Sequence, residues 1–144
     1  FGESRAVTVR CQKRFKLMFY TEESFESAGL RGVDLRGVDL RDADLRDADL
    51  AFAILRGAVL TKAVMTRANL RYVDLTHADL SGANLEGANL ENTDLTHADL
   101  EDANLEGANL ENTELTYTNL TNIKYSINTV WPKGFCLARH RLTK

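Results

Sequence analysis

Residues 81–120 read SGANLEGANLENTDLTHADLEDANLEGANLENTELTYTNL, and the two halves of this stretch match at fourteen of twenty positions. Within it, a Leu returns at every fifth residue. The same period extends over residues 30–120, where 18 of the 19 multiples of five are Leu and the exception is Met65. A second series of small residues, mostly Ala, lies two positions before each of them. The fold therefore has to bury one large apolar side chain for every five residues.

A five-residue period fits neither standard element. On an α-helix, each step of five would move the Leu side chain about 140° around the axis. In a flat strand, an odd step would place alternate Leu residues on opposite faces. The chain must therefore bend once in every five residues so that all Leu side chains face one axis, and four such bends close a square.

The match at a shift of twenty predicts that each residue stacks on the residue twenty positions later. Residues 26–125 then form about five coils, with an N-terminal capping segment in residues 1–25 and a cap with a basic tail in residues 126–144. We expect the repeat register to end at Tyr125. The predicted core includes Leu30, Leu50, Met65, Leu70, Leu90 and Leu110, and the predicted C-terminal cap is formed by Trp131, Pro132 and Phe135.

The repeats GANLEGANL, THADL and RDADLRDADL resemble those of the pentapeptide-repeat family. The resemblance covers about 100 of the 144 residues. It implies an all-β fold, the right-handed quadrilateral β-helix, while saying little about function, because such repeats specify a fold. The segment NTVWPKGF, residues 128–135, is similar to one that follows the repeats in many cyanobacterial members.

Asp or Asn usually precedes each Leu, and we expect these residues to lie at the bends, where their side chains bond to nearby backbone. In one column, three successive stacked residues are acidic. Their like charges cost stability, so this column is either tolerated strain or a functional acidic strip, formed by Asp74, Asp94 and Glu114.

The Asp/Asn pattern breaks once, at three successive apolar positions. With two neighbouring aromatic residues they form a partly exposed apolar belt in Phe52, Ile54, Val59, Val64 and Tyr72. One interpretation is local β-propensity with aromatic stacking. The other is a candidate partner-binding surface.

His77 and His97 are twenty residues apart, and Tyr117 continues their column. Two stacked imidazoles do not make a metal site without a third ligand, and none is close in register. We therefore predict a solvated surface column, no bound metal and no cofactor.

Charge is uneven along the chain. Residues 1–67 hold 12 Lys+Arg and 10 Asp+Glu, residues 68–125 hold 2 and 11, and residues 126–144 hold 4 and none. Four Arg residues of the first coil alternate with Asp, which argues against direct nucleic-acid binding. No run of 18 apolar residues exists, so no membrane association is expected. We expect a cytoplasmic protein, or one of the periplasm or thylakoid lumen if the N-terminus is processed.

Catalytic motifs are absent: the chain has no Walker loop, nucleophile elbow, HExxH or clustered Cys and His ligands. The leading hypothesis is a non-enzymatic scaffold, a monomer or an end-to-end dimer, that offers a rigid surface to another protein. The alternative follows from the resemblance to the quinolone-resistance branch of the family. Those members look like duplex DNA to type II topoisomerases, so gyrase is a candidate partner, and the acidic C-terminal half is consistent with such mimicry.

Overall fold

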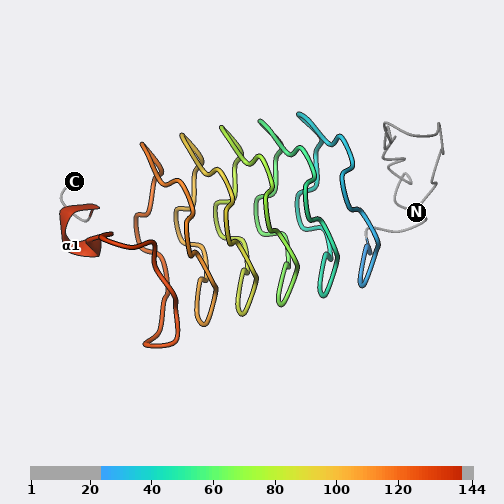
Figure 1. The fold of residues 1–144 in the computed structure, drawn as a ribbon. Helices are drawn as coiled ribbons and strands as arrows, with labels where there is room; N and C mark the ends of the chain where they lie inside the picture. The colour runs from blue at the N-terminus through green and yellow to red at the C-terminus, as the bar shows by residue number, and fades with distance from the viewer. Residues whose placement is uncertain (1–23, 141–144) are drawn as a thin grey trace.

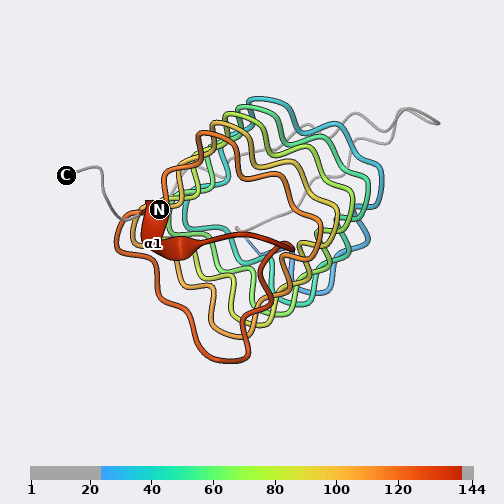
Figure 2. The ribbon, with the colours of Figure 1, turned by 60° about the vertical axis from the view of Figure 1, so that its left-hand side comes forward.

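The computed structural model describes residues 24–140 of the chain. Over this range the chain winds as a stack of similar coils (Figure 1). Seen from nearer the axis, the coils overlie one another and outline a four-sided ring (Figure 2). The expected N-terminal cap lies outside the described residues except for its last two, Ser24 and Phe25.

Parallel backbone bridges join neighbouring coils, and all but the last connect residues twenty positions apart. Asn69 pairs with Asn89, for example, and Asn89 with Asn109. Leu70 N–H donates to Asn89 O at 2.8 Å, and Asn89 N–H donates to Ala68 O at 2.9 Å. The predicted twenty-residue shift is confirmed. The β structure consists of isolated bridges rather than long strands, because a turn follows every bridge.

A two-residue turn follows each Leu and forms the corner of the square. In the turn after Leu50, Ala53 N–H donates to Leu50 O at 2.9 Å, and Phe52 between them has a φ of 62°. The second turn residue has positive φ on every coil, the left-handed region that favours Gly and Asn. Bulky residues at this position carry backbone strain, so their side chains need compensating contacts.

The expected place of Asp and Asn at the bends is wrong, since these residues occupy the bridge positions in the middle of each face. Their side chains nevertheless bond to nearby backbone as expected. Thr76 N–H donates to Asp74 Oδ1 at 3.0 Å, and Glu91 N–H donates to Asn89 Oδ1 at 3.1 Å. The short polar side chain thus fixes the start of the following turn without needing unusual dihedral angles itself.

The interior is a column of Leu side chains lined by small residues. The six predicted core residues are at most 2% exposed. Where Thr replaces the small Ala, its hydroxyl bonds to the preceding coil: Thr93 Oγ1 donates to Leu70 O at 2.6 Å. A buried hydroxyl is thereby satisfied, which is why the core accepts a polar residue there.

The strict twenty-residue register ends at Tyr125, as expected, but the coil itself continues beyond this residue. Val130 pairs with Asn109, at a shift of twenty-one, so the last coil continues through Val130 with one extra residue. Beyond it, Trp131, Phe135 and Leu137 are partly buried against the core, and the rings of Trp131 and Phe135 stack at 5.0 Å. Phe135 N–H donates to Pro132 O at 3.0 Å. A short helix, α1 (Leu137–His140), ends the described chain.

Candidate interaction face

One of the four faces has aromatic rings along both of its edges, and we call it the aromatic-edged face. Its midline consists of bridge residues, and its edges consist of the second turn residues on either side. The midline residues are Asp34, Ile54, Asp74, Asp94 and Glu114. One edge comprises Gly32, Phe52, Tyr72, Asn92 and Asn112, and the other Gly37, Gly57, His77, His97 and Tyr117, all with positive φ.

The first edge carries a stacked aromatic pair held between two cations. The Phe52 and Tyr72 rings are 4.8 Å apart with an interplanar angle of 7°. The Arg31 guanidinium lies over Phe52 at 4.8 Å, and the Arg71 guanidinium lies over Tyr72 at 5.4 Å. Both rings remain close to half exposed, at 48% and 45%. The contacts offset the strain of two aromatic residues at positive φ and leave a rigid, accessible aromatic surface.

The second edge carries a three-ring stack. His77 and His97 are 4.9 Å apart, and His97 and Tyr117 are also 4.9 Å apart. Parallel rings direct their nitrogens side by side rather than toward a common point, so the two imidazoles are poorly placed to share a metal ion. Among the described residues, no group of three or more His, Cys, Asp or Glu side chains is arranged to hold one. The predicted surface column is present, and its Tyr117 ring is 78% exposed.

The predicted acidic strip forms the C-terminal part of the midline of this face. Asp74 bridges to Asp94, and Asp94 bridges to Glu114. Asp74 Oδ1 accepts the Thr76 hydroxyl at 2.6 Å, and Asp94 Oδ1 accepts Thr96 N–H at 2.9 Å. One oxygen of each Asp therefore stabilises a turn, which favours the structural explanation for these two residues while leaving their second oxygens for other contacts.

The predicted apolar belt does not form a single surface. Ile54 lies on the aromatic-edged face, whereas Val59 and Val64 pair with residues of the next two faces around the square. All three are half-buried. Because five residues separate one face from the next, a flat partner touching Phe52, Tyr72 and Ile54 would not reach Val64 on the opposite side. Of the candidate partner-binding surface predicted from sequence, only Phe52, Ile54 and Tyr72 therefore lie on one face.

Sequence reasoning treated the apolar belt, the acidic strip and the His column separately. The structure brings Phe52, Tyr72, Ile54, the strip and the His77–His97–Tyr117 column together on one face. The signal was present in the sequence, because positions 52, 54 and 57 and their twenty-residue repeats belong to a single side of the square.

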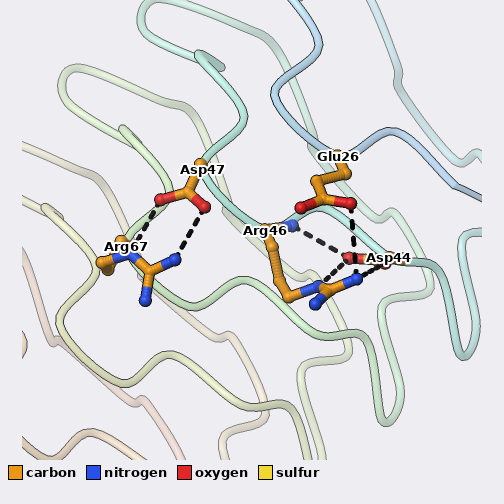
Figure 3. A network of polar contacts seen from close by, with 5 residues as sticks. All are labelled: Glu26, Asp44, Arg46, Asp47 and Arg67. Carbon is orange, nitrogen blue, oxygen red and sulfur yellow. Dashed lines mark hydrogen bonds and ion pairs between the residues drawn. The ribbon is translucent and has the colours of Figure 1, made fainter.

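A cluster of exposed ion pairs lies on other parts of the N-terminal coils (Figure 3). Arg46 Nε donates to Asp44 Oδ1 at 2.8 Å and Arg46 Nη2 contacts Glu26 Oε2 at 3.4 Å. Arg67 bonds both oxygens of Asp47 at 2.8 Å across one coil step. The hydrogen bonds from Arg46 and Arg67 hold the pKa values of the Asp44 and Asp47 carboxyls below their ordinary range.

Replacing Arg67 by Gln should raise the pKa of Asp47 toward its ordinary value, because the charged hydrogen-bond donor is lost. A lowered folded-state pKa stabilises the fold above the unfolded pKa of about 4, and this contribution disappears as pH falls through the folded pKa. The melting temperature of the variant should therefore fall less steeply below about pH 4. Carboxyl carbon chemical shifts followed against pH measure the pKa directly. An unchanged Asp47 titration in the variant would contradict the ion pair.

The described part of the chain holds no helix that is long and apolar enough to span a membrane. Its one helix, α1, has 4 residues.

Comparisons with known proteins agree with this architecture. The family model described as pentapeptide repeats matches residues 43–82, 74–112 and 93–124, with 8 copies. A pentapeptide repeat protein from the Arabidopsis thaliana thylakoid lumen is 39% identical with a TM-score of 0.64, and the match covers 65% of this chain and 66% of that one, slightly under two thirds of its length.

Two cyanobacterial structures are also similar. A pentapeptide repeat protein from Cyanothece 51142 is 34% identical over 76% of this chain and 91% of its own, with a TM-score of 0.52. Another, from Nostoc PCC 7120, is 30% identical over 82% of this chain and 81% of its own, with a TM-score of 0.53. Structures of this kind are right-handed quadrilateral β-helices. Among curated proteins, none matches the chain significantly.

Proposed function

Because the chain belongs to the pentapeptide-repeat family, we propose that it is a non-enzymatic scaffold that binds another protein through the aromatic-edged face. The single observation that carries this proposal is the presence of exposed rings along both edges of one face. A few residues supply most of the binding energy in protein interfaces, and Tyr and Arg are enriched among them. Here they are already fixed by stacking, so little conformational entropy is lost on binding.

The absence of enzymatic activity is supported by the nature of the interior. A continuous column of buried Leu and small side chains fills the coils, which leaves little room for the concave site that substrates usually occupy. The Gly residues at the corners have positive φ and serve the turns. They therefore have a structural reason to be present that requires no phosphate ligand.

A double variant, Phe52→Asn with Tyr72→Asn, tests the proposal. Asn tolerates positive φ, as Asn92 and Asn112 show in the same column, so the variant removes the rings without imposing a new backbone conformation. In affinity purification from the source organism, we expect proteins retained by the parent chain to be lost from the variant, with a nearly unchanged melting temperature.

The matched control is Lys62→Asn with Asp102→Asn. These residues occupy the equivalent positive-φ position, ten residues away in register and hence at the opposite corner of the square. The control should retain the same proteins as the parent chain. Equal retention by the parent and the Phe52/Tyr72 variant would refute a role for this face.

Mimicry of duplex DNA toward gyrase is the second candidate function, and the observation that favours it is the acidic C-terminal half, with 2 Lys+Arg against 11 Asp+Glu in residues 68–125. The N-terminal coils oppose it, since Arg36, Arg41 and Arg46 interrupt the negative charge. A supercoiling assay decides between the two: unchanged gyrase activity at micromolar protein removes mimicry.

For the location of the protein, the cytoplasm is the leading candidate, and the periplasm or the thylakoid lumen is the alternative. The similarity to a lumenal Arabidopsis protein supports the lumen. Immunodetection in separated soluble and thylakoid fractions distinguishes the lumen from the cytoplasm.

A further inference from the structure

Three coils of the aromatic-edged face combine exposed rings with an excess of negative charge. These three C-terminal rows comprise residues 71–77, 91–97 and 111–117. They contain five acidic side chains and one basic side chain, namely Glu91, Glu111, Asp74, Asp94, Glu114 and Arg71. Arg71 is already bound, because its Nε lies 3.1 Å from Glu91 Oε2 and its Nη2 donates to Glu91 Oε1 at 3.1 Å. The other four carboxylates therefore give these rows a net negative charge.

Within the part of the chain that the structure describes, the midline carboxylates of these rows have no counter-cation. None of the ion pairs formed within residues 24–140 involves Asp74, Asp94 or Glu114. Direct bridging of their backbones sets the spacing between successive carboxylates at about 4.8 Å, so the strip is about 10 Å long. Alternate side chains of an extended peptide are about 6.7 Å apart. The strip can therefore receive two such side chains.

The rings of this face already bind guanidinium groups within the chain. Arg31 lies over Phe52 and Arg71 over Tyr72, which shows that the edge geometry permits a cation above a ring. The Tyr117 ring lies in the same row as Glu111 and Glu114 and is largely exposed. Within the described chain, no Arg or Lys lies over it. A cationic side chain from outside would find both a ring and a carboxylate there.

We propose that the partner segment bound by the aromatic-edged face is an extended, Arg-rich peptide lying over the three C-terminal rows. This inference rests on the proposed function and specifies the class of partner. Charge complementarity gives its position. Arg36 is paired with Asp34, but Arg31 and Arg56 leave the two N-terminal rows with a net positive charge that repels a basic peptide. Arg is favoured over Lys, since a planar guanidinium can stack on a ring while bonding to a carboxylate.

The probe is an acetylated, amidated peptide, Arg-Ser-Arg-Ser-Arg, labelled for fluorescence anisotropy and titrated with the full chain at low and at physiological salt. The test variant is Asp74→Asn with Asp94→Asn, which removes two negative charges, as many as the matched control removes. Asn keeps the oxygen that accepts the turn hydrogen bond, and it occurs naturally at bridge positions such as Asn89 and Asn109. Each exposed opposite-charge pair contributes a factor of about 1.5 to 5. We expect the variant to bind about tenfold more weakly.

The matched control is Asp79→Asn with Asp99→Asn, at the same kind of bridge position on the neighbouring face, which has rings along only one edge. It should bind the peptide nearly as well as the parent chain. A second variant, Tyr117→Asn, should lose about two- to fivefold in affinity at unchanged net charge. A Lys-Ser-Lys-Ser-Lys peptide should bind more weakly than the Arg peptide.

If the strip variant and the control lose equal affinity for the peptide, the peptide responds only to net charge and the proposal is overturned. Absence of peptide binding to the parent chain also overturns it. These results leave the scaffold function intact if the Phe52/Tyr72 variant still loses its retained proteins. The opposite result is also informative. If the strip variant binds the peptide more weakly but the Phe52/Tyr72 variant retains the same proteins as the parent chain, the peptide site is supported and the proposed function is refuted.

Discussion

Replacing Leu90 by Ala should lower the free energy of unfolding by about 2–5 kcal/mol. Leu90 is 0% exposed and lies in the middle of the stack, with a coil on either side. The coils are tied by backbone bonds such as Leu90 N–H to Asn109 O at 2.7 Å, so the neighbours cannot close in on the space that the shortened side chain leaves. The loss therefore includes both the transfer of the Leu side chain and the cavity.

Chemical denaturation followed by circular dichroism measures this effect. Met65→Leu is the control, because it restores the repeat pattern at a position that is also 0% exposed and nearly conserves volume. It should change the free energy of unfolding by less than about 1.5 kcal/mol. A Leu90→Ala variant as stable as the parent chain would contradict a close-packed leucine column.

Removing one whole coil should leave a folded protein, whereas removing slightly more should not. Deletion of residues 81–100 joins Leu80 to Glu101 and preserves the register: Met65 N–H would then meet Asn104 O in place of Asn84 O, its present acceptor at 2.7 Å. Because repeat proteins are stabilised by contacts between neighbouring units, the shortened stack keeps the same contacts. The denaturant m-value should fall by about a fifth, in proportion to the surface buried.

Deletion of residues 81–102 is the matched comparison, since it removes only two residues more. It joins Leu80 to Ala103 and eliminates the two residues that form the corner of the square. The later coils can then no longer overlie the earlier ones, and we expect loss of the cooperative transition and of the β-type circular dichroism signal. Similar unfolding curves for the two deletions would refute the twenty-residue register.

The last coil shows where a change in coil length is tolerated. Val130 pairs with Asn109 at a shift of twenty-one, so one added residue is accommodated where no further coil has to stack upon it. Sequence analysis placed the end of the strict register at Tyr125, and the shift of twenty-one agrees with this. What the sequence could not show is that Thr129 Oγ1 bonds Leu105 O at 2.8 Å and thereby holds the irregular coil in place.

The Asp and Asn residues that precede each Leu were also predicted only in part. Their short polar side chains were expected to bond to nearby backbone, and they do, as the Thr76 bond to Asp74 illustrates. Their location at the corners was wrong. Residue type indicates which local hydrogen bonds are possible, while the position of the turn depends on which residue can adopt positive φ, and that position is taken by Phe52, His77 and their equivalents.

By itself, the sequence determined the four-sided coil, its twenty-residue length and its leucine interior, because a strict five-residue period leaves only one way to bury every Leu. Only the tertiary structure decided which surface residues act together. Phe52, Asp94 and Tyr117 are far apart along the chain but share one face, whereas Ile54 and Val64, only ten residues apart, face opposite sides. Burial is encoded by periodicity along the chain, but a surface is assembled across coils, so its composition follows from stacking rather than from proximity in sequence.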